Sequence, residues 1–149
     1  MDKLENNKFD PLKLENQLCF TIYAASRLMT RQYQPYLDQL GITYPQYLVL
    51  LVLWEKDGIG VNEIGCKLYL NTNTLTPLLK RMEQLSFIQR IKCCNDERKV
   101  LIYLSEQGKN LKNEAKSIPL EMANSLNCDI EKAMCLKKEL EVLINKMRK

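Results

Sequence analysis

The feature that most constrains the fold of this chain is the uninterrupted order of elements predicted between Val61 and Ser105. In sequence order, they are a short helical stretch (VNEIGCKLYL, 61–70), a polar turn (NTNT, 71–74), an amphipathic basic helix (LTPLLKRMEQL, 75–85) and two alternating strands (FIQRIK, 87–92, and KVLIYL, 99–104) around a polar tip (CCNDER, 93–98). Helix, turn, helix and hairpin in this order predict a winged helix-turn-helix. The expected fold class is therefore mainly α with a small β-hairpin wing (α+β).

The second helix of this unit is the predicted DNA-recognition helix. We place its start between Asn71 and Thr74, although Pro77 is best tolerated in the first turn of a helix. A helix in the major groove reads bases through short polar side chains near its N-terminus, and nearby cations hold phosphates. The candidate DNA contacts of the turn and helix are Asn71, Thr72, Asn73, Thr74, Thr76, Lys80 and Arg81.

The wing supplies the remaining candidate DNA contacts, which are Asp96, Arg98 and Lys99. Arg98 can reach a minor groove, helped if Asp96 holds its guanidinium in place. A charge run is often only a solvated surface, and Lys80 or Arg81 alone does not distinguish the two interpretations. The combination of helix, turn and wing favours DNA binding.

An amphipathic helix is predicted before this unit, over about residues 14–33. Its apolar face carries Leu14, Leu18, Ile22, Ala25 and Met29. Pro35 and Gly41 then punctuate the chain and leave room for one short helical stretch, PYLDQL. Thr43 and Gln46 form a candidate capping box before YLVLLVLW, which we expect to be a buried helix that ends near Gly58.

Further helices follow the wing. Ser105 is expected to cap a helix that continues through a bend at Pro119, and a last amphipathic helix begins at about Asp129. One small domain would struggle to cover the apolar faces at both ends, so a helical dimer interface is expected, with intramolecular packing as the alternative. The expected organisation is a single domain over 1–149, with a DNA-binding lobe at 61–105 and dimerisation regions at 10–42 and 106–149.

Composition excludes several classes of function. The chain has six cysteines, no CxxC pair and no histidine, so zinc-finger spacing, a histidine general base and a Cys-His nucleophile pair are absent, and neither a metal nor another cofactor is expected. The apolar runs are too short to cross a bilayer, and the start MDKLENNKFD does not resemble a secretion signal. We expect a cytoplasmic protein with no membrane partner, whose cysteines are thiols. The net charge of +4 attracts phosphate only where the basic groups cluster.

A second group of interest lies in LENQLCFTIYAAS, where Cys19 and Tyr23 are four residues apart and share a helical face. A tyrosine hydroxyl can donate to a thiolate and favour the charged form, which a peroxide oxidises first to a sulfenic acid. From these residues alone, an inert cysteine that packs as a small hydrophobe is the commoner interpretation.

Two stretches of the chain resemble a known family. KLENQLCFTIYAASRLMTRQYQPYLDQLGITYPQYLVLLVLWE and LYLNTNTLTPLLKRMEQLSFIQRIKCCNDERKVLIYLSEQG are similar to the multiple-antibiotic-resistance (MarR) family of dimeric winged-helix regulators, in particular its organic-hydroperoxide-resistance repressors. The similarity covers about Leu12 to Leu120. The DER motif of the wing is shared by much of the family, whereas the LCF cysteine with tyrosines downstream is particular to its peroxide sensors.

The resemblance implies roles for individual residues. It places the peroxide-reacting cysteine at Cys19 and its hydrogen-bonding tyrosines at Tyr23, Tyr33 and, from the partner subunit, Tyr44. It places the base-reading helix at Asn71 to Met82, and the minor-groove arginine and its support at Arg98 and Asp96. The turn NTNT replaces the more usual Asp-Ser-Gly-Thr, so the operator preference is expected to differ.

The resemblance also implies two ways in which oxidised Cys19 is processed. Either a low-molecular-weight thiol caps it, or a second cysteine from the other subunit resolves it; Cys128 lies roughly where such a residue is expected, and Cys135 is a rival. Cys93 and Cys94 are expected to be loop thiols, because a bridge between neighbours strains the backbone. Cys66 is expected in the core.

The function that follows is a homodimeric repressor that binds pseudo-palindromic double-stranded operator DNA and releases it when an organic hydroperoxide oxidises Cys19. One alternative is a repressor gated by a phenolic or other apolar ligand, with Cys19 as a wall residue. The others are a thiol peroxidase that uses Cys19 and an architectural DNA-binding protein without a switch.

Overall fold

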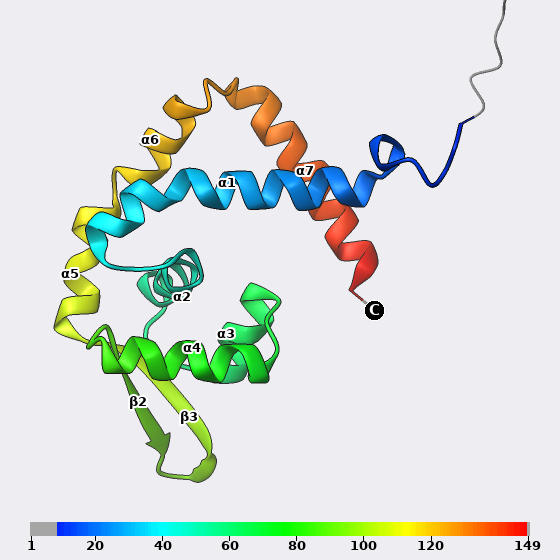
Figure 1. Cartoon of the computed structure of the whole chain (residues 1–149). Coiled ribbons are helices and arrows are strands. Elements are labelled where there is room, and N and C mark those ends of the chain that lie inside the picture. Colours follow the sequence, from blue (N-terminus) through cyan, green and yellow to red (C-terminus); the bar gives the residue numbers. More distant parts are fainter. Residues whose placement is uncertain (1–8, 149) are drawn as a thin grey trace, which may run out of the picture.

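The computed structural model describes residues 9–148 and is mostly helical, with one small sheet, as the sequence predicts (Figure 1). In sequence order, the elements are a short 3-10 helix η1 (Leu14–Asn16), α1 (Leu18–Leu40), α2 (Tyr44–Glu55), β1 (Ile59–Gly60), α3 (Val61–Leu68), α4 (Thr72–Gln84), β2 (Ile88–Cys93), β3 (Asp96–Leu104), α5 (Glu106–Ala115), α6 (Ile118–Ser125) and α7 (Ile130–Met147). Residues 1–8 and 149, on which much of the expectation about a secretion signal falls, lie outside the described part.

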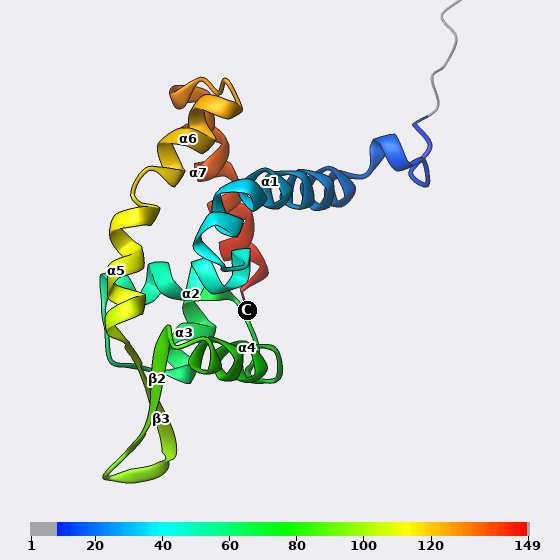
Figure 2. The same ribbon diagram turned by 60° about the vertical axis from the view of Figure 1, so that its left-hand side comes forward.

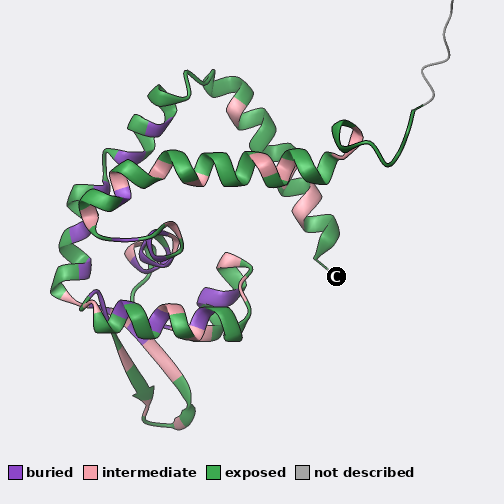
Figure 3. Ribbon diagram, in the orientation of Figure 1, coloured by how far each residue is buried: buried purple, intermediate pink, exposed green. Residues whose placement is uncertain are grey.

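Helix α2 forms the centre of the core. Val49, Leu50 and Leu53 are at most 1% exposed, so the prediction of a buried helix is confirmed. The predicted capping box is also present, and the backbone N–H of Thr43 donates to Oε1 of Gln46 at 2.9 Å. The helix ends at Glu55, earlier than the predicted end near Gly58. Buried residues gather on α2 and on the sides of the neighbouring elements that face it (Figure 3).

The sheet is antiparallel, with the strand order β1-β3-β2. The two-residue strand β1 was not predicted; its Ile59 pairs with Ile102 of β3. The predicted polar tip is too long, because Cys93 pairs with Asp96 and only two residues connect the strands. The DER motif therefore lies in β3 rather than in a loop. Two-residue connections suit the twist of paired strands, so the hairpin extends as far as the turn permits.

Helix α1 continues through Pro35, and the prediction of a separate short helix after this residue is wrong. Proline removes one backbone hydrogen bond and bends a helix, and the last turns of α1 bend toward the core in both views (Figures 1 and 2). Leu37 is fully buried just after the proline, so tertiary packing holds the helix together there. The helix ends at Gly41, which adopts a φ of +67° that favours glycine.

Helices α5 and α7 begin where the sequence predicts, directly after Ser105 and Asp129. The backbone N–H of Gly108 donates to Oγ of Ser105 at 3.0 Å, and the N–H of Glu131 donates to Oδ1 of Asp129 at 3.0 Å. The prediction that the helix after Ser105 continues through a bend at Pro119 is wrong, because α5 ends at Ala115 and a separate helix α6 begins at Ile118. Pro119 lies in the first turn of α6, where its missing N–H costs nothing.

Helix α7 and the N-terminal half of α1 lie away from the core. None of the residues of α7 is buried (Figure 3). On α1, Leu18 and Leu28 are 65% and 60% exposed. No helix in residues 9–148 is both long and apolar enough to cross a membrane.

Candidate nucleic-acid interface and thiol site

The predicted recognition helix is α4, and its start at Thr72 falls within the predicted interval. Asn71 is the N-cap: its Oδ1 accepts the backbone N–H of Thr74 at 3.0 Å. The predicted apolar face is confirmed by Leu75, Leu79 and Met82, each at most 1% exposed. Pro77 lies inside the helix rather than in its first turn, which leaves the carbonyl of Asn73 without its usual helical partner.

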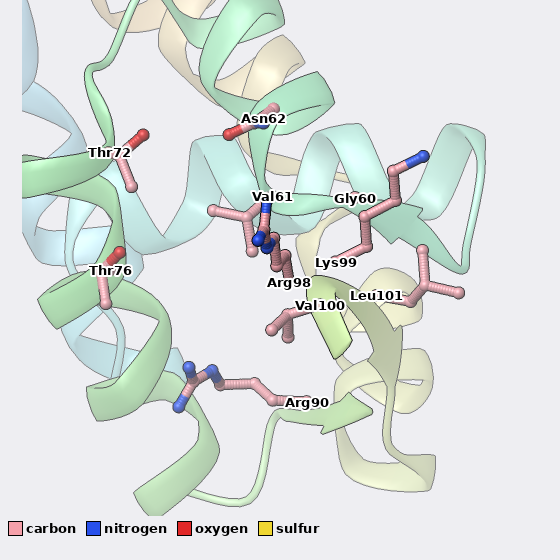
Figure 4. A pocket seen from close by; sticks show the side chains of 10 residues that line it. All are labelled: Gly60, Val61, Asn62, Thr72, Thr76, Arg90, Arg98, Lys99, Val100 and Leu101. Atoms are coloured by element: carbon pink, nitrogen blue, oxygen red, sulfur yellow. The ribbon is translucent and has the colours of Figure 1, made fainter. Parts of the chain in front are cut away.

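An open cavity of about 370 Å³ lies between the start of α3, helix α4 and the wing (Figure 4). It brings together four of the predicted DNA contacts, which are Thr72, Thr76, Arg98 and Lys99. Two further polar residues line it, Asn62 at the start of α3 and Arg90 on β2, and neither was predicted. The only signal for Arg90 was a basic residue between the isoleucines of FIQRIK.

The other predicted contacts on α4 lie outside this cavity. Asn73, Thr74, Lys80 and Arg81 are exposed on the helix surface, and Asn71 lines a neighbouring cavity together with Thr72. Side chains that contact phosphates or bases must be exposed, and these residues of α4 meet that requirement.

Asp96 does not hold the guanidinium of Arg98, so that expectation is corrected. Its Oδ1 instead accepts the backbone N–H of Arg98 at 3.0 Å. An aspartate readily bonds the backbone two residues further along, a contact that forms locally without immobilising the long arginine side chain. Asp96 therefore shapes the hairpin, and the exposed Arg98 side chain stays available.

Cys19 lies in the first turn of α1 and is exposed. Tyr23 is on the same helix, but in the described part of the chain no hydrogen bond joins it to Cys19. Its hydroxyl accepts a hydrogen bond from Nη1 of Arg27 at 2.9 Å, and the guanidinium carbon lies 5.6 Å from the centre of the tyrosine ring. This contact uses the Tyr23 hydroxyl as an acceptor and leaves its donor capacity unused.

Three tyrosines pack together where the C-terminal half of α1 meets α2, and we call Tyr33, Tyr44 and Tyr47 the tyrosine cluster. The ring centroids of Tyr33 and Tyr44 are 4.9 Å apart, and Tyr47 lies 5.9 and 6.2 Å from them. Burial raises the pKa of all three phenols, and the neighbouring Tyr44 raises that of Tyr33 further. The hydroxyls therefore stay protonated and can act as hydrogen-bond donors. Tyr47 was missed, although its i, i+3 spacing from Tyr44 was visible.

The division of the tyrosines between subunits is corrected by this geometry. Cys19 and Tyr33 lie on one continuous helix, and their separation of fourteen residues corresponds to roughly 21 Å. Tyr33 therefore cannot contact Cys19 of its own chain. Tyr33 and Tyr44 are neighbours, so a single thiol can contact both, and that thiol is not Cys19 of the same chain.

The remaining cysteines are free thiols in the structure. Cys66 is exposed on α3, so its expected place in the core is wrong: Ile64 and Gly65 face the core and turn the next residue outward. Cys128 lies exposed in the connection between α6 and α7, and Cys135 lies exposed on α7. Cys94 is exposed at the wing tip as predicted, whereas Cys93 ends β2. In residues 9–148 no group of side chains has the arrangement of a metal site.

Comparisons with known proteins find transcriptional regulators. The family of SarA/Rot transcriptional regulators matches residues 31–115. An organic hydroperoxide resistance transcriptional regulator of Bacillus subtilis is 59% identical over 113 residues, which are 76% of this chain and 77% of that protein.

Two solved structures of AbfR, a protein of Staphylococcus epidermidis, are also similar. Overoxidised AbfR bound to DNA has 40% identity and a TM-score of 0.74, and covers 90% of this chain and 94% of its own. Disulfide-formed AbfR has 41% identity and a TM-score of 0.61, over 88% and 92%. These relatives are transcriptional regulators rather than enzymes, so the peroxidase interpretation is set aside. The chain belongs to the MarR family of winged-helix, DNA-binding transcriptional regulators, in its organic hydroperoxide resistance group.

Proposed function

We propose that this protein is a homodimeric, cytoplasmic repressor that releases operator DNA when an organic hydroperoxide oxidises Cys19. The observation that carries the proposal is the arrangement of α1. This helix has an exposed cysteine near one end and an uncovered apolar face along the half that carries the cysteine. Near its other end it contributes Tyr33 to the tyrosine cluster, whose other two members lie on α2. The name of the Bacillus subtilis relative supports an organic hydroperoxide as the signal.

The uncovered faces of α1 and α7 support a homodimer. They line an open apolar cavity of about 660 Å³ whose residues include Leu18, Ile22, Ala25, Met29, Leu136, Leu140 and Leu143. Exposed apolar surface of this extent favours burial against another protein surface, and a two-fold axis lets the same surface serve both copies. We assign residues 10–42 and 106–149 to dimerisation and 61–105 to DNA binding.

A two-fold axis across α1 would also complete the thiol site. When two copies of one helix cross in opposite directions, the N-terminal half of each meets the C-terminal half of the other. Cys19 would then lie beside the tyrosine cluster of the partner subunit. The cluster of its own chain is too far along α1 to contact it. Phenol donors favour the thiolate, the form that attacks a peroxide.

The proposed reaction begins when the thiolate sulfur of Cys19 attacks one oxygen of the hydroperoxide. The O–O bond breaks, the sulfur becomes a sulfenic acid, and the rest of the peroxide leaves as an alcohol after it takes up a proton. A second thiol can then condense with the sulfenic acid, forming an S–S bond and releasing water. The second thiol belongs to a small molecule, to Cys128 or to Cys135.

A bridge from Cys128 would have to join two subunits. Within one chain, the connection between α6 and α7 lies apart from the start of α1 in both views (Figures 1 and 2). AbfR supplies a precedent for a disulfide form. Because overoxidised AbfR was captured on DNA, oxidation and release must be measured separately.

The switch acts on the spacing of the two recognition helices. We assign operator contacts to Thr72, Asn73, Thr74, Thr76, Lys80, Arg81, Arg98 and Lys99. Half-sites of a palindrome lie about 34 Å apart, so a small shift of the dimer helices breaks one set of contacts. A loss of about 3 kcal/mol would weaken binding roughly a hundredfold.

The test is a gel shift with the promoter DNA upstream of the protein's own gene, with and without stoichiometric cumene hydroperoxide, together with intact-mass analysis. Cys19→Ser should bind DNA as the wild type does and ignore the peroxide. Cys94→Ser is the matched control, because this exposed thiol lies in the wing, and it should respond as the wild type does. Release of Cys19→Ser by the peroxide would remove Cys19 from the mechanism.

The apolar cavity between α1 and α7 favours one second candidate, a repressor gated by a small phenolic or other apolar ligand. In that case Cys19 would be a neighbour of the ligand and not a reactant. Release of DNA by such a compound, with the Cys19→Ser variant as sensitive as the wild type, would favour this candidate.

A further inference from the structure

We infer that Glu83 and Arg90 form a clamp that fixes the wing against the recognition helix, which makes them positioning residues for DNA binding. The inference rests on the DNA-binding function of the family and is independent of the peroxide switch. Glu83 lies in the last turn of α4, and Arg90 lies in the middle of β2.

The first contact of the clamp involves the backbone of the wing. Strand β2 is at the edge of the sheet, since β3 pairs with it on one side only. The N–H of Arg90 donates to Oε1 of Glu83 at 2.9 Å, so the carboxylate occupies a position that a further strand would otherwise take. A hydrogen bond to an ionised acceptor is among the stronger ones in proteins.

The second contact involves the side chain of the same arginine. Its guanidinium turns toward α4 (Figure 4). Nη1 of Arg90 lies 3.7 Å from Oε2 of Glu83. The Arg90 side chain is only 24% exposed, and its Nε is buried without a hydrogen-bond partner. Among the ion pairs of residues 9–148, only the pair with Glu83 involves Arg90. The Glu83 carboxylate therefore compensates this half-buried positive charge. One carboxylate thus holds both the backbone and the side chain of Arg90.

The clamp closes a tight connection between two parts of the DNA-binding surface. Only three residues connect α4 to β2, and Ser86 among them has a φ of +64°, which side chains rarely adopt. Thr72 and Thr76 lie on α4, whereas Arg98 and Lys99 lie on β3, and the cavity separates the two groups (Figure 4). The angle between helix and wing therefore decides whether both groups reach one duplex together.

The test compares Glu83→Gln, Arg90→Gln and the double variant on a duplex that the wild-type protein selects from a random-sequence pool. Glutamine at 83 keeps an acceptor for the backbone N–H but removes the charge that faces the guanidinium. Each single change should weaken DNA binding about fivefold to tenfold. The double variant should bind about as well as the single variant with the lower affinity, because both changes remove the same ion pair. Arg90→Lys, which keeps the charge, should restore part of the affinity.

Two further readouts distinguish a clamp from a phosphate contact or from general destabilisation. The dependence of affinity on salt should keep its slope, because a clamp releases no counterion from DNA. The loss caused by Arg98→Ala should be smaller in the Glu83→Gln background than in the wild type, because a loose wing no longer places Arg98. Glu106→Gln is the matched control: it breaks the exposed Lys109–Glu106 pair at 3.2 Å and should leave binding unchanged.

Three results would overturn the clamp. The first concerns the slope of the logarithm of the binding constant against the logarithm of the salt concentration. If Arg90→Gln makes this slope less steep by about one while Glu83→Gln binds DNA normally, Arg90 is a phosphate contact. The second is additivity of the two single changes, and the third is a fall in melting temperature large enough to account for the lost binding. Peroxide takes no part in these measurements, so failure of the clamp leaves the proposed switch standing, and failure of the switch leaves the clamp standing.

Discussion

Asn71 has a capping role in the fold of α4 and a predicted role in DNA binding, and two substitutions can separate these roles. Its Oδ1 accepts the N–H of Thr74 at 3.0 Å and satisfies one of the amides that the first turn of α4 leaves free. Asn71→Ala removes this acceptor, whereas Asn71→Asp keeps it and adds a negative charge. The two variants therefore differ in capping but share the loss of the amide.

The size of the effect follows from the capping contact. Loss of an exposed N-cap costs about 1 kcal/mol, so Asn71→Ala should lower the melting temperature by roughly 3 °C. The proposed dimer has two copies of α4, so DNA binding is expected to lose about 2 kcal/mol, which is roughly thirtyfold. Asn71→Asp should melt at or above the wild-type temperature, because a carboxylate is favourable at a helix N-terminus. Its charge should still weaken DNA binding, because the proposed interface places residue 71 near phosphates.

The assay pairs thermal unfolding followed by circular dichroism with titration of fluorescein-labelled duplex. Both variants should bind DNA more weakly, and only the alanine variant should melt earlier. If Asn71→Ala melts with the wild type, the cap does not hold the start of α4. If Asn71→Asp binds as tightly as the wild type, the N-terminus of α4 does not face the phosphates, and the placement of the interface is wrong.

Three further predictions concern the packing of the core. Gly108→Ala should lower the free energy of unfolding by about 3 kcal/mol or more in urea titrations, because a Cβ would lie 2.1 Å from the backbone oxygen of Phe87; a loss below about 1 kcal/mol would contradict this. Trp54→Phe should cost about 1 kcal/mol in the same assay, because the indole N–H donates to the carbonyl of Gly108 at 2.9 Å, and an unchanged midpoint would count against that bond. The raised pKa values of the tyrosine cluster stabilise the fold below about pH 10 and cease to do so as the pH rises through the folded-state values. The free energy of unfolding should therefore fall above pH 10, less steeply in Tyr47→Phe; equal slopes would show that the cluster is solvated.

Local signals in the chain predicted most of the elements, together with the caps at Thr43 and Ser105. Asn71, Ser105 and Asp129 are recognisable because a capping side chain bonds an amide two or three residues away. The buried α2 and the apolar face of α4 follow from hydrophobic periodicity, which also lies within a few turns of helix. Pro35 is an exception, because the sequence predicted that the helix ends there and α1 continues through it. Proline disfavours the interior of an isolated helix, but burial of Leu37 in the core stabilises the helix after Pro35.

By itself, the sequence determined the winged helix-turn-helix fold, the position of α4 and the choice of Cys19 as the cysteine to test, because periodicity, caps and motifs each lie within short stretches. Only the tertiary structure decided which side chains meet. It placed Tyr33 beside Tyr44 and far from Cys19, bonded Asp96 to a backbone amide, and joined Glu83 to Arg90. Contacts of this kind depend on the path of the whole chain and on the balance between burial and hydrogen bonding at each site, neither of which has a fixed spacing in sequence.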